Sequence, residues 1–206
     1  PLFRAKVKAM NTNQDRKAQR KRLLTLVQGA VIAALYLVST FLTSAISFGI
    51  VQFRIAEALA ALAILFPGAP LGLFVGCLLA NLLNPASLGI IDILGGSIAT
   101  GIAALLTYRL GRSYRRSLRA YFLSKQAADR PRLISRLIPL LAPVIINAVV
   151  VGIYLPFIIQ GADPTLPVIL ISMLSIFISQ SFAVYALGLP LLLALERTPV
   201  ARDAVL

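Results

Sequence analysis

Apolar residues dominate the chain between residues 24 and 196 and form long runs separated by short polar or Gly/Pro segments. About 20 apolar residues cross a hydrocarbon core of ~30 Å. Four runs therefore predict membrane-spanning helices: Leu24–Ile46, Gly89–Leu110, Leu137–Ile159 and Val168–Leu195. The run Ile55–Leu83 is cut by Phe66-Pro67-Gly68-Ala69-Pro70, a turn signal that predicts two shorter helices. The pattern predicts an all-α integral membrane protein, a bundle of six transmembrane helices.

Positive charge is concentrated in two segments. Residues 1–23 hold eight basic residues and one acidic residue, and residues 109–136 hold nine and one. Cytoplasmic segments of membrane proteins carry such an excess of Lys and Arg, so both segments are expected inside and an even number of crossings must separate them. The interrupted run supplies the fourth crossing, which puts both termini in the cytoplasm. The predicted domains are a basic N-terminal segment (1–23), a six-helix membrane domain (24–196, with a basic cytoplasmic loop at about 111–136) and a cytoplasmic tail (197–206).

Composition supports this class of protein. Of the 206 residues, 59% are hydrophobic and 13% are charged, whereas an average soluble domain has about a quarter of its residues charged. We therefore expect a multi-pass protein of the cell membrane, of the bacterial plasma-membrane type. The net charge of +13 would suggest a nucleic-acid partner in a soluble protein, but anionic lipid headgroups explain basic segments beside apolar helices. We expect these basic segments to interact with the lipid bilayer and not with nucleic acid.

The side chains that usually carry catalysis are missing. The chain has no His and a single Cys, Cys77, which we interpret as a small buried apolar residue; no metal site is expected. It also has no Gly-rich phosphate loop and no paired Asp motif. We predict that the protein is not an enzyme, has no catalytic residues and uses no cofactor.

Charged and amide side chains inside the apolar runs are the candidate functional residues, because each is costly in lipid and needs a partner or a cavity. On the six-helix map, Glu57, Asn81 and Asp92 lie within about one or two turns of the outer surface. The sequence predicts a polar binding pocket in the outward half of the bundle, formed by Gln52, Arg54, Glu57, Asn81, Asp92, Asn147 and Gln180.

A purely structural interpretation of these residues is also open. Arg54 could pair with Glu57 at a spacing of three, and Asp92 could cap the helix that follows it. A carboxylate combined with side-chain amides, however, suits a flat polar heterocycle, since the carboxylate accepts from adjacent N–H groups and an amide both donates and accepts. The chain contains no nucleotide-binding motif, so it could not itself use ATP to drive uphill transport. An ion gradient or a partner protein would have to supply the energy.

Four segments resemble the QueT family of queuosine-precursor transport proteins. They are Ser47–Leu59 (SFGIVQFRIAEAL), Gly76–Leu83 (GCLLANLL), Ile91–Thr100 (IDILGGSIAT) and Pro143–Ala148 (PVIINA). The resemblance covers about residues 24–196, in the right order and at compatible spacing. The basic stretch before Leu23 and the Arg-rich segment Arg112–Arg136 are longer than the family pattern.

The resemblance implies a substrate-binding S subunit of an energy-coupling-factor (ECF) ABC transporter. It implies a small-molecule substrate of the 7-deazaguanine type, such as the aminomethyl or cyano precursor of queuine, held near the outer face. It further implies assembly with a membrane coupling subunit and two cytoplasmic ATPase subunits. S subunits meet the coupling subunit through small residues on the first helix, and Ala30 and Ala34 have that spacing.

Two alternatives remain open. The protein could be a self-sufficient secondary transporter of a small polar heterocycle or vitamin-like compound, with Asp92 or Glu57 as a proton site. Ala30 and Ala34 could also serve packing within the bundle, because Ala is common in any apolar helix.

Overall fold

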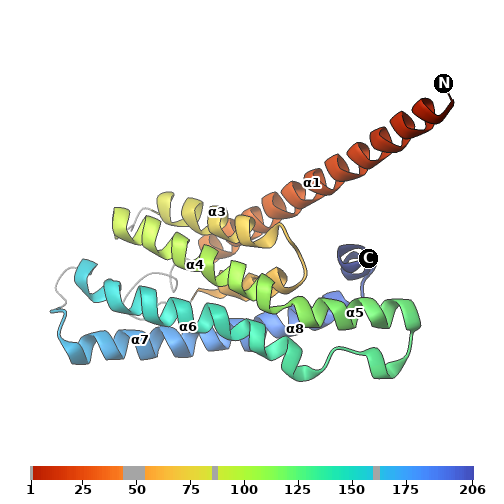
Figure 1. Ribbon diagram of the computed structural model, residues 1–206. Coiled ribbons are helices and arrows are strands. Elements are labelled where there is room, and N and C mark those ends of the chain that lie inside the picture. Colours follow the sequence, from red (N-terminus) through yellow and green to blue (C-terminus); the bar gives the residue numbers. More distant parts are fainter. Residues whose placement is uncertain (1, 44–53, 85–87, 160–162) are drawn as a thin grey trace.

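The computed structural model describes residues 2–43, 54–84, 88–159 and 163–206. Every regular element in this part of the chain is helical (Figure 1). Four of these helices are long and apolar enough to cross a membrane: Gln14–Leu42, Ile90–Leu110, Leu133–Ile158 and Leu166–Glu196. They match the four long apolar runs, so the prediction of an all-α membrane protein is confirmed. The six crossings and the cytoplasmic position of both termini stay predictions.

The long helices pack as neighbours along the bundle. Helix α4 (Ile90–Leu110) packs against α6 (Leu133–Ile158), and α6 packs against α7 (Leu166–Ser181) (Figure 1). Helix α1 (Leu2–Leu42) packs against the shorter α3 (Ala69–Leu82), which in turn contacts α4. Helix α7 continues through a π-helical segment, η3 (Phe182–Gly188), into α8 (Leu189–Glu196). One long composite helix therefore closes the bundle.

The predicted interruption at Phe66–Pro70 is present. It separates α3 from a 3₁₀ helix, η1 (Ile55–Ile64), and Pro70 lies in the first turn of α3. At about 2.0 Å per residue η1 is roughly 20 Å long, and at 1.5 Å per residue α3 is about as long, both shorter than a hydrocarbon core of ~30 Å. Nearly all of η1 is buried, because α1, α4 and η3 pack around it. The element in the middle of the bundle is thus shielded from lipid.

Helices also extend into segments that the sequence analysis treats as charged ends. Helix α1 begins at Leu2 rather than at Leu24, and the expected loop at 111–136 contains helix α5 (Arg112–Ser124) and the short η2 (Ala127–Asp129). In α5, Tyr114 and Leu118 are buried one turn apart. This spacing gives an amphipathic helix, in which Arg and Ser occupy the exposed face. A further helix, α9 (Pro199–Val205), lies in the C-terminal tail.

Arg115 has a different environment from its neighbours in α5. Its Nη1 donates a hydrogen bond of 2.6 Å to the carbonyl oxygen of Ile64, the last residue of η1. Its guanidinium also lies 4.0 Å from the ring centroid of Tyr108. Arg112, Arg116 and Arg119, by contrast, are exposed. Arg115 therefore satisfies a carbonyl at the end of a helix, a structural role in addition to its charge.

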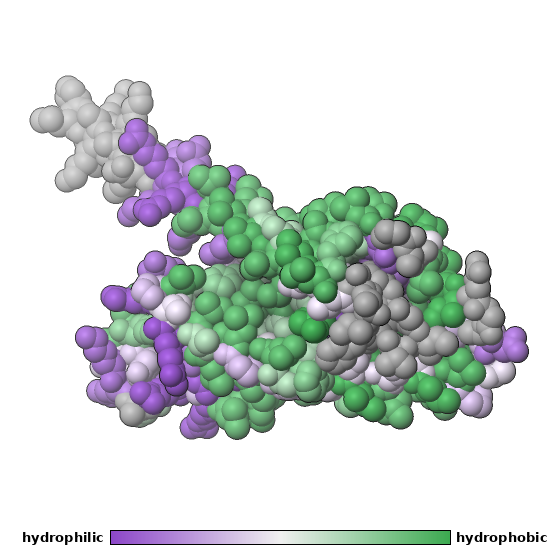
Figure 2. Space-filling view, turned by 180° about the vertical axis from the view of Figure 1, so that it is seen from behind, coloured by the Kyte–Doolittle hydropathy of each residue, from purple (hydrophilic) through white to green (hydrophobic). Residues whose placement is uncertain are grey.

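The surface agrees with insertion in a bilayer. Figure 2 shows hydrophobic residues covering the sides of the long helices and hydrophilic residues gathered at the end where α5 lies. Large apolar side chains are exposed on each long helix, among them Val31 on α1, Ile98 on α4, Ile145 on α6 and Leu174 on α7. Exposed apolar area on this scale has no place on a soluble monomer. The chain is a multi-pass membrane protein.

Glycines bring α1 and α3 into backbone contact. Gly68, Gly72 and Gly76, each four residues after the last, meet Gly29 and Ala33 of α1. A Cβ at Gly72 would overlap the carbonyl oxygen of Gly29, and one at Gly76 would lie 2.9 Å from the carbonyl oxygen of Ala33. Such close approach is the usual basis of helix association in lipid, where burial of apolar surface gives no driving force.

We expect Gly72→Ala to lower the free energy of unfolding by about 1–3 kcal/mol, because backbone atoms on both helices would have to separate. The matched control is Gly101→Ala, whose Cβ would lie 3.1 Å from the ring of Phe74, a side chain that can turn aside. Thermal unfolding in detergent should show a clear fall for Gly72→Ala and a smaller change for Gly101→Ala. Equal changes would contradict backbone contact as the cause.

Candidate functional site

Glu57 lies at the centre of a buried polar cluster. It occupies the first turn of η1, and its side chain is 2% exposed. Its Oε1 accepts hydrogen bonds from Tyr36 Oη (2.6 Å) and Thr100 Oγ1 (3.3 Å). Its Oε2 accepts from Asn147 Nδ2 (3.3 Å) and Gln180 Nε2 (3.0 Å). All four partners are neutral, and with η1 they connect α1, α4, α6 and α7 at one carboxylate.

The two oxygens of Glu57 face different surroundings. Asn147 and Gln180, the donors to Oε2, line a small cavity together with Arg54, Thr100 and apolar residues. Tyr36, the closest donor to Oε1, is fully buried in the core. The cavity has a volume of about 20 Å³, enough for about one water molecule. Oε2 is therefore bonded to two amides that line the cavity, whereas Oε1 is bonded to Thr100, which also lines it, and to the buried Tyr36.

A second carboxylate, Asp92, lies beside this cavity. Its Oδ2 is 3.8 Å from Nη2 of Arg54, and its Oδ1 accepts a hydrogen bond of 2.9 Å from Tyr154 Oη. Asn81 Nδ2 lies 3.4 Å from the backbone carbonyl oxygen of Asp92. Arg54 also lines the cavity beside Glu57, so it connects Asp92 with the cavity.

Cys77 lies between the hydrogen bonds around Glu57 and those around Asp92. Its Sγ is 3.7 Å from Asn81 Nδ2 and from Thr100 Oγ1, and 3.9 Å from Arg54 Nη1. The side chain is fully buried, as the sequence analysis expects, but its neighbours are polar. Sulfur is a weak acceptor, so Cys77 tolerates this position without strong hydrogen bonds.

The structure brings six of the seven predicted pocket residues into one connected cluster; Gln52 lies outside the described residues. Both structural alternatives are unsupported: the ion pair formed by Arg54 is with Asp92, and the side chain of Asp92 makes no capping hydrogen bond in α4. Sequence reasoning missed four members, which are Tyr36, Cys77, Thr100 and Tyr154. Hydroxyl and thiol side chains are ordinary in apolar helices, and only their place on the inward face would have marked them.

The chemistry of the cluster favours binding over catalysis or metal coordination. In the described part of the chain, no group of three or more His, Cys, Asp or Glu side chains could hold a metal ion. The carbonyl-type oxygens Oδ1 of Asn81 and Asn147 are buried and have no hydrogen-bond partner among the described residues. A buried acceptor without a donor is costly. The cluster can therefore offer two carboxylates, a guanidinium and free amide oxygens to a polar ligand.

The predicted docking residues Ala30 and Ala34 lie on the exposed face of α1. The opposite face of the same helix carries Gly29, Ala33 and Tyr36, which are buried against α3 and η1. Packing of Ala30 and Ala34 within the bundle, one of the interpretations left open, is therefore wrong.

A bundle of apolar helices around a buried polar cluster is typical of membrane transport proteins. The chain belongs to the QueT transporter family, which matches residues 26–197. Members of this family are non-enzymatic transporters, so the prediction that the chain is not an enzyme is confirmed, and membership implies transport of a queuosine precursor. No curated protein and no solved structure matches the chain.

Proposed function

We propose that the protein is the substrate-binding S subunit of an ECF-type importer and captures a 7-deazaguanine at the outer face. The observation that carries this proposal is the position of Glu57, whose Oε2 borders a cavity together with two side-chain amides. The 2-aminopyrimidinone edge of a deazaguanine presents adjacent N–H donors, which a carboxylate accepts as a pair. Its ring carbonyl would accept from Gln180 or Arg54, and the free oxygen of Asn147 would accept from a further N–H.

Binding requires the cavity to enlarge. A fused two-ring heterocycle needs several times the space of the single water that about 20 Å³ accommodates. The amides of Asn147 and Gln180 at Oε2 and the hydroxyl of Thr100 at Oε1 are the groups to be exchanged, because each of two adjacent ligand N–H groups bonds to one carboxylate oxygen. Tyr36 would meanwhile hold Oε1 in place. Specificity follows, since a ligand without these donors would leave a buried carboxylate unsatisfied.

The direct test of the substrate is mass spectrometry of small molecules retained by protein purified in mild detergent. We expect a 7-deazaguanine to be released when the purified protein is denatured. The test of the S-subunit assignment is co-purification of a membrane coupling subunit and two ATPase subunits from the native membrane. Uptake by the chain alone in proteoliposomes would instead support a self-sufficient secondary transporter.

We further propose six crossings with both termini in the cytoplasm. Helix α5 and the C-terminal end of α8 lie at one end of the bundle, and the first residues of α4 and α7 lie at the other (Figure 1). The positive-inside rule assigns the basic end to the cytoplasm. The domain boundaries at 23 and 196 follow the same assignment.

Labelling of an introduced thiol tests this orientation. A Ser124→Cys protein in intact cells should react with a membrane-permeant maleimide and not with an impermeant one, because residue 124 is at the cytoplasmic end of α5. The parent protein is a suitable control, since its Cys77 is fully buried. Reaction of residue 124 with the impermeant reagent would contradict the orientation.

A further inference from the structure

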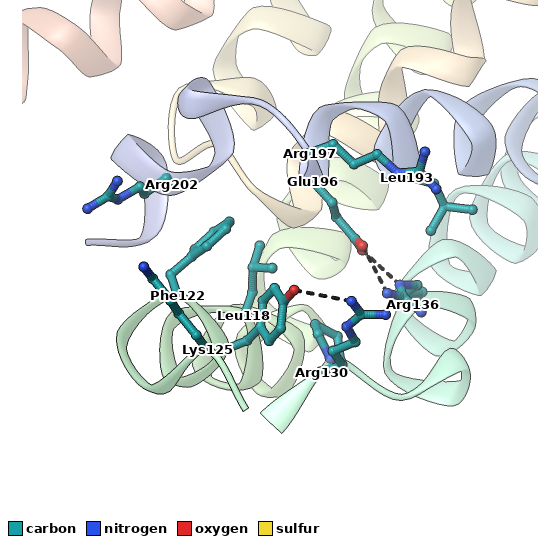
Figure 3. Close-up of a pocket in the computed structure, with 11 residues that line it drawn as sticks. Leu118, Phe122, Lys125, Arg130, Arg136, Leu193, Glu196, Arg197 and Arg202 are labelled. Atoms are coloured by element: carbon teal, nitrogen blue, oxygen red, sulfur yellow. Dashed lines mark hydrogen bonds and ion pairs between the residues drawn. The ribbon is translucent and has the colours of Figure 1, made fainter. Parts of the chain in front are cut away.

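A large cavity opens at the basic end of the bundle, far along the helices from the Glu57 cluster. It lies between α5, the start of α6, the end of α8 and α9, and has a volume of about 770 Å³ (Figure 3). Five cationic side chains and one carboxylate line it: Lys125, Arg130, Arg136, Arg197, Arg202 and Glu196. We call it the basic-end cavity. Its charge alone favours an anionic occupant.

The single carboxylate is already fully engaged. Arg136 contacts both oxygens of Glu196, with Nε and Nη2 at 2.8 and 2.9 Å, and Tyr114 Oη donates to the same group at 2.6 Å. Burial and this hydrogen bond raise the pKa of the Tyr114 phenol well above its usual range, so it remains a donor. Glu196 therefore compensates Arg136 and leaves the other cations of the cavity unbalanced.

The remaining cations stand on two opposing walls. Lys125 directly follows α5, and Arg130 directly follows η2. On the opposite wall, Arg197 directly follows α8 and Arg202 lies in α9 (Figure 3). Arg130 donates to Tyr121 Oη at 3.3 Å. The side chains of Lys125, Arg197 and Arg202 are exposed and make no hydrogen bond or ion pair with the residues that the structure describes. Guanidinium groups bind phosphate oxygens in a two-pronged geometry, which suits this arrangement.

The cavity also has an apolar side. Leu118, Phe122 and Leu193 line it beside the cations. Phe122 and Leu193 are only partly buried, so this apolar side is open to an occupant. A free anion gains no binding energy from apolar side chains. A lipid, by contrast, places its headgroup among the cations and its acyl chains along apolar surfaces. Basic pockets between helices at a membrane surface are typical headgroup sites.

We propose that the basic-end cavity binds the phosphate-bearing headgroup of an anionic phospholipid. The shared chemistry is that of a phosphate group, and the apolar side formed by Leu118, Phe122 and Leu193 favours a lipid over a soluble phosphate. The site is separate from the substrate cluster and does not depend on the identity of the imported molecule.

Native mass spectrometry of the purified protein with phosphatidylglycerol tests this proposal. The parent protein should retain phosphatidylglycerol in preference to phosphatidylcholine. Arg197→Gln combined with Arg202→Gln should weaken retention at least about tenfold, because two headgroup contacts are lost. The matched control is Lys17→Gln with Arg20→Gln, which removes the same charge from an exposed part of α1 and should have little effect.

Folding and ligand source are controlled in the same experiment. Arg197 and Arg202 are exposed, so the double variant should unfold at the parent temperature without lipid. Arg197→Lys with Arg202→Lys should restore only part of the retention, because Lys keeps the charge and loses the two-pronged geometry. An equal loss in the α1 double variant would overturn the proposal, since net charge would then explain binding. Inorganic phosphate that displaces the lipid at low millimolar concentration would also overturn it, because the site would then take a free anion.

Discussion

Replacing Glu57 by Gln is expected to weaken binding of a 7-deazaguanine at least about tenfold, the largest effect of any single substitution in the cluster. The carboxylate accepts four hydrogen bonds and is the only group at the cavity that accepts from adjacent N–H donors with both charge and geometry in its favour. Removing one partner of a buried charged hydrogen bond costs about 2–5 kcal/mol. Isothermal titration of the purified protein measures the change.

Two further variants separate charge from position. Tyr36→Phe keeps the carboxylate and removes one hydrogen bond on the Oε1 side, so it should weaken binding far less than Glu57→Gln. Asp15→Asn removes an acidic group from an exposed site on α1 and should leave binding unchanged. If neither Glu57→Gln nor Asp92→Asn altered the affinity, the cluster would not be the substrate site.

The second large effect concerns uptake and not binding. Ala30→Trp combined with Ala34→Trp should abolish uptake in cells while the purified protein binds its ligand normally. Both residues lie on the exposed face of α1, where the proposed coupling subunit would approach closely, and bulky side chains at a close-packed interface are destabilising. A position that faces only lipid would tolerate Trp at almost no cost.

The matched control for this variant lies on α7. Leu174 and Ile178 have the same spacing and are 59% and 60% exposed. Leu174→Trp with Ile178→Trp should leave both uptake and binding intact, provided that α7 faces lipid. Normal uptake by the α1 double variant would show that this face does not dock the partner.

The sequence allowed the long helices to be predicted because apolar run length is itself the physical requirement for crossing a membrane. It failed for α5, because a high density of Arg was taken to mean a loop, although Tyr114 and Leu118 already had helical spacing. The extent of α1 was missed for a similar reason. Charge does not end a helix, and Lys, Arg, Gln and Ala are all good helix formers.

Residue type alone singles out several members of the polar cluster. Glu57, Asp92 and Arg54 are conspicuous in an apolar sequence because ionised groups are rare in lipid. Tyr36 and Thr100 contact the same carboxylate, but their hydroxyls are unremarkable until the helix faces are known. The same holds for small residues: the motif singled out on α1 lies on its exposed face, whereas the glycines that bind α1 to α3 became evident only from their contacts.

Helix η1 mechanically couples the two ends of the molecule. Glu57 lies in its first turn, and the carbonyl oxygen of Ile64 at its last residue is bonded to Arg115 of α5. An axial displacement of η1 at the polar cluster would therefore move the carbonyl oxygen of Ile64, and either α5 or the side chain of Arg115 would have to follow it to keep this hydrogen bond. If the cavity around Glu57 enlarges through movement of η1, this ten-residue helix would transmit the displacement to α5 at the basic end of the bundle.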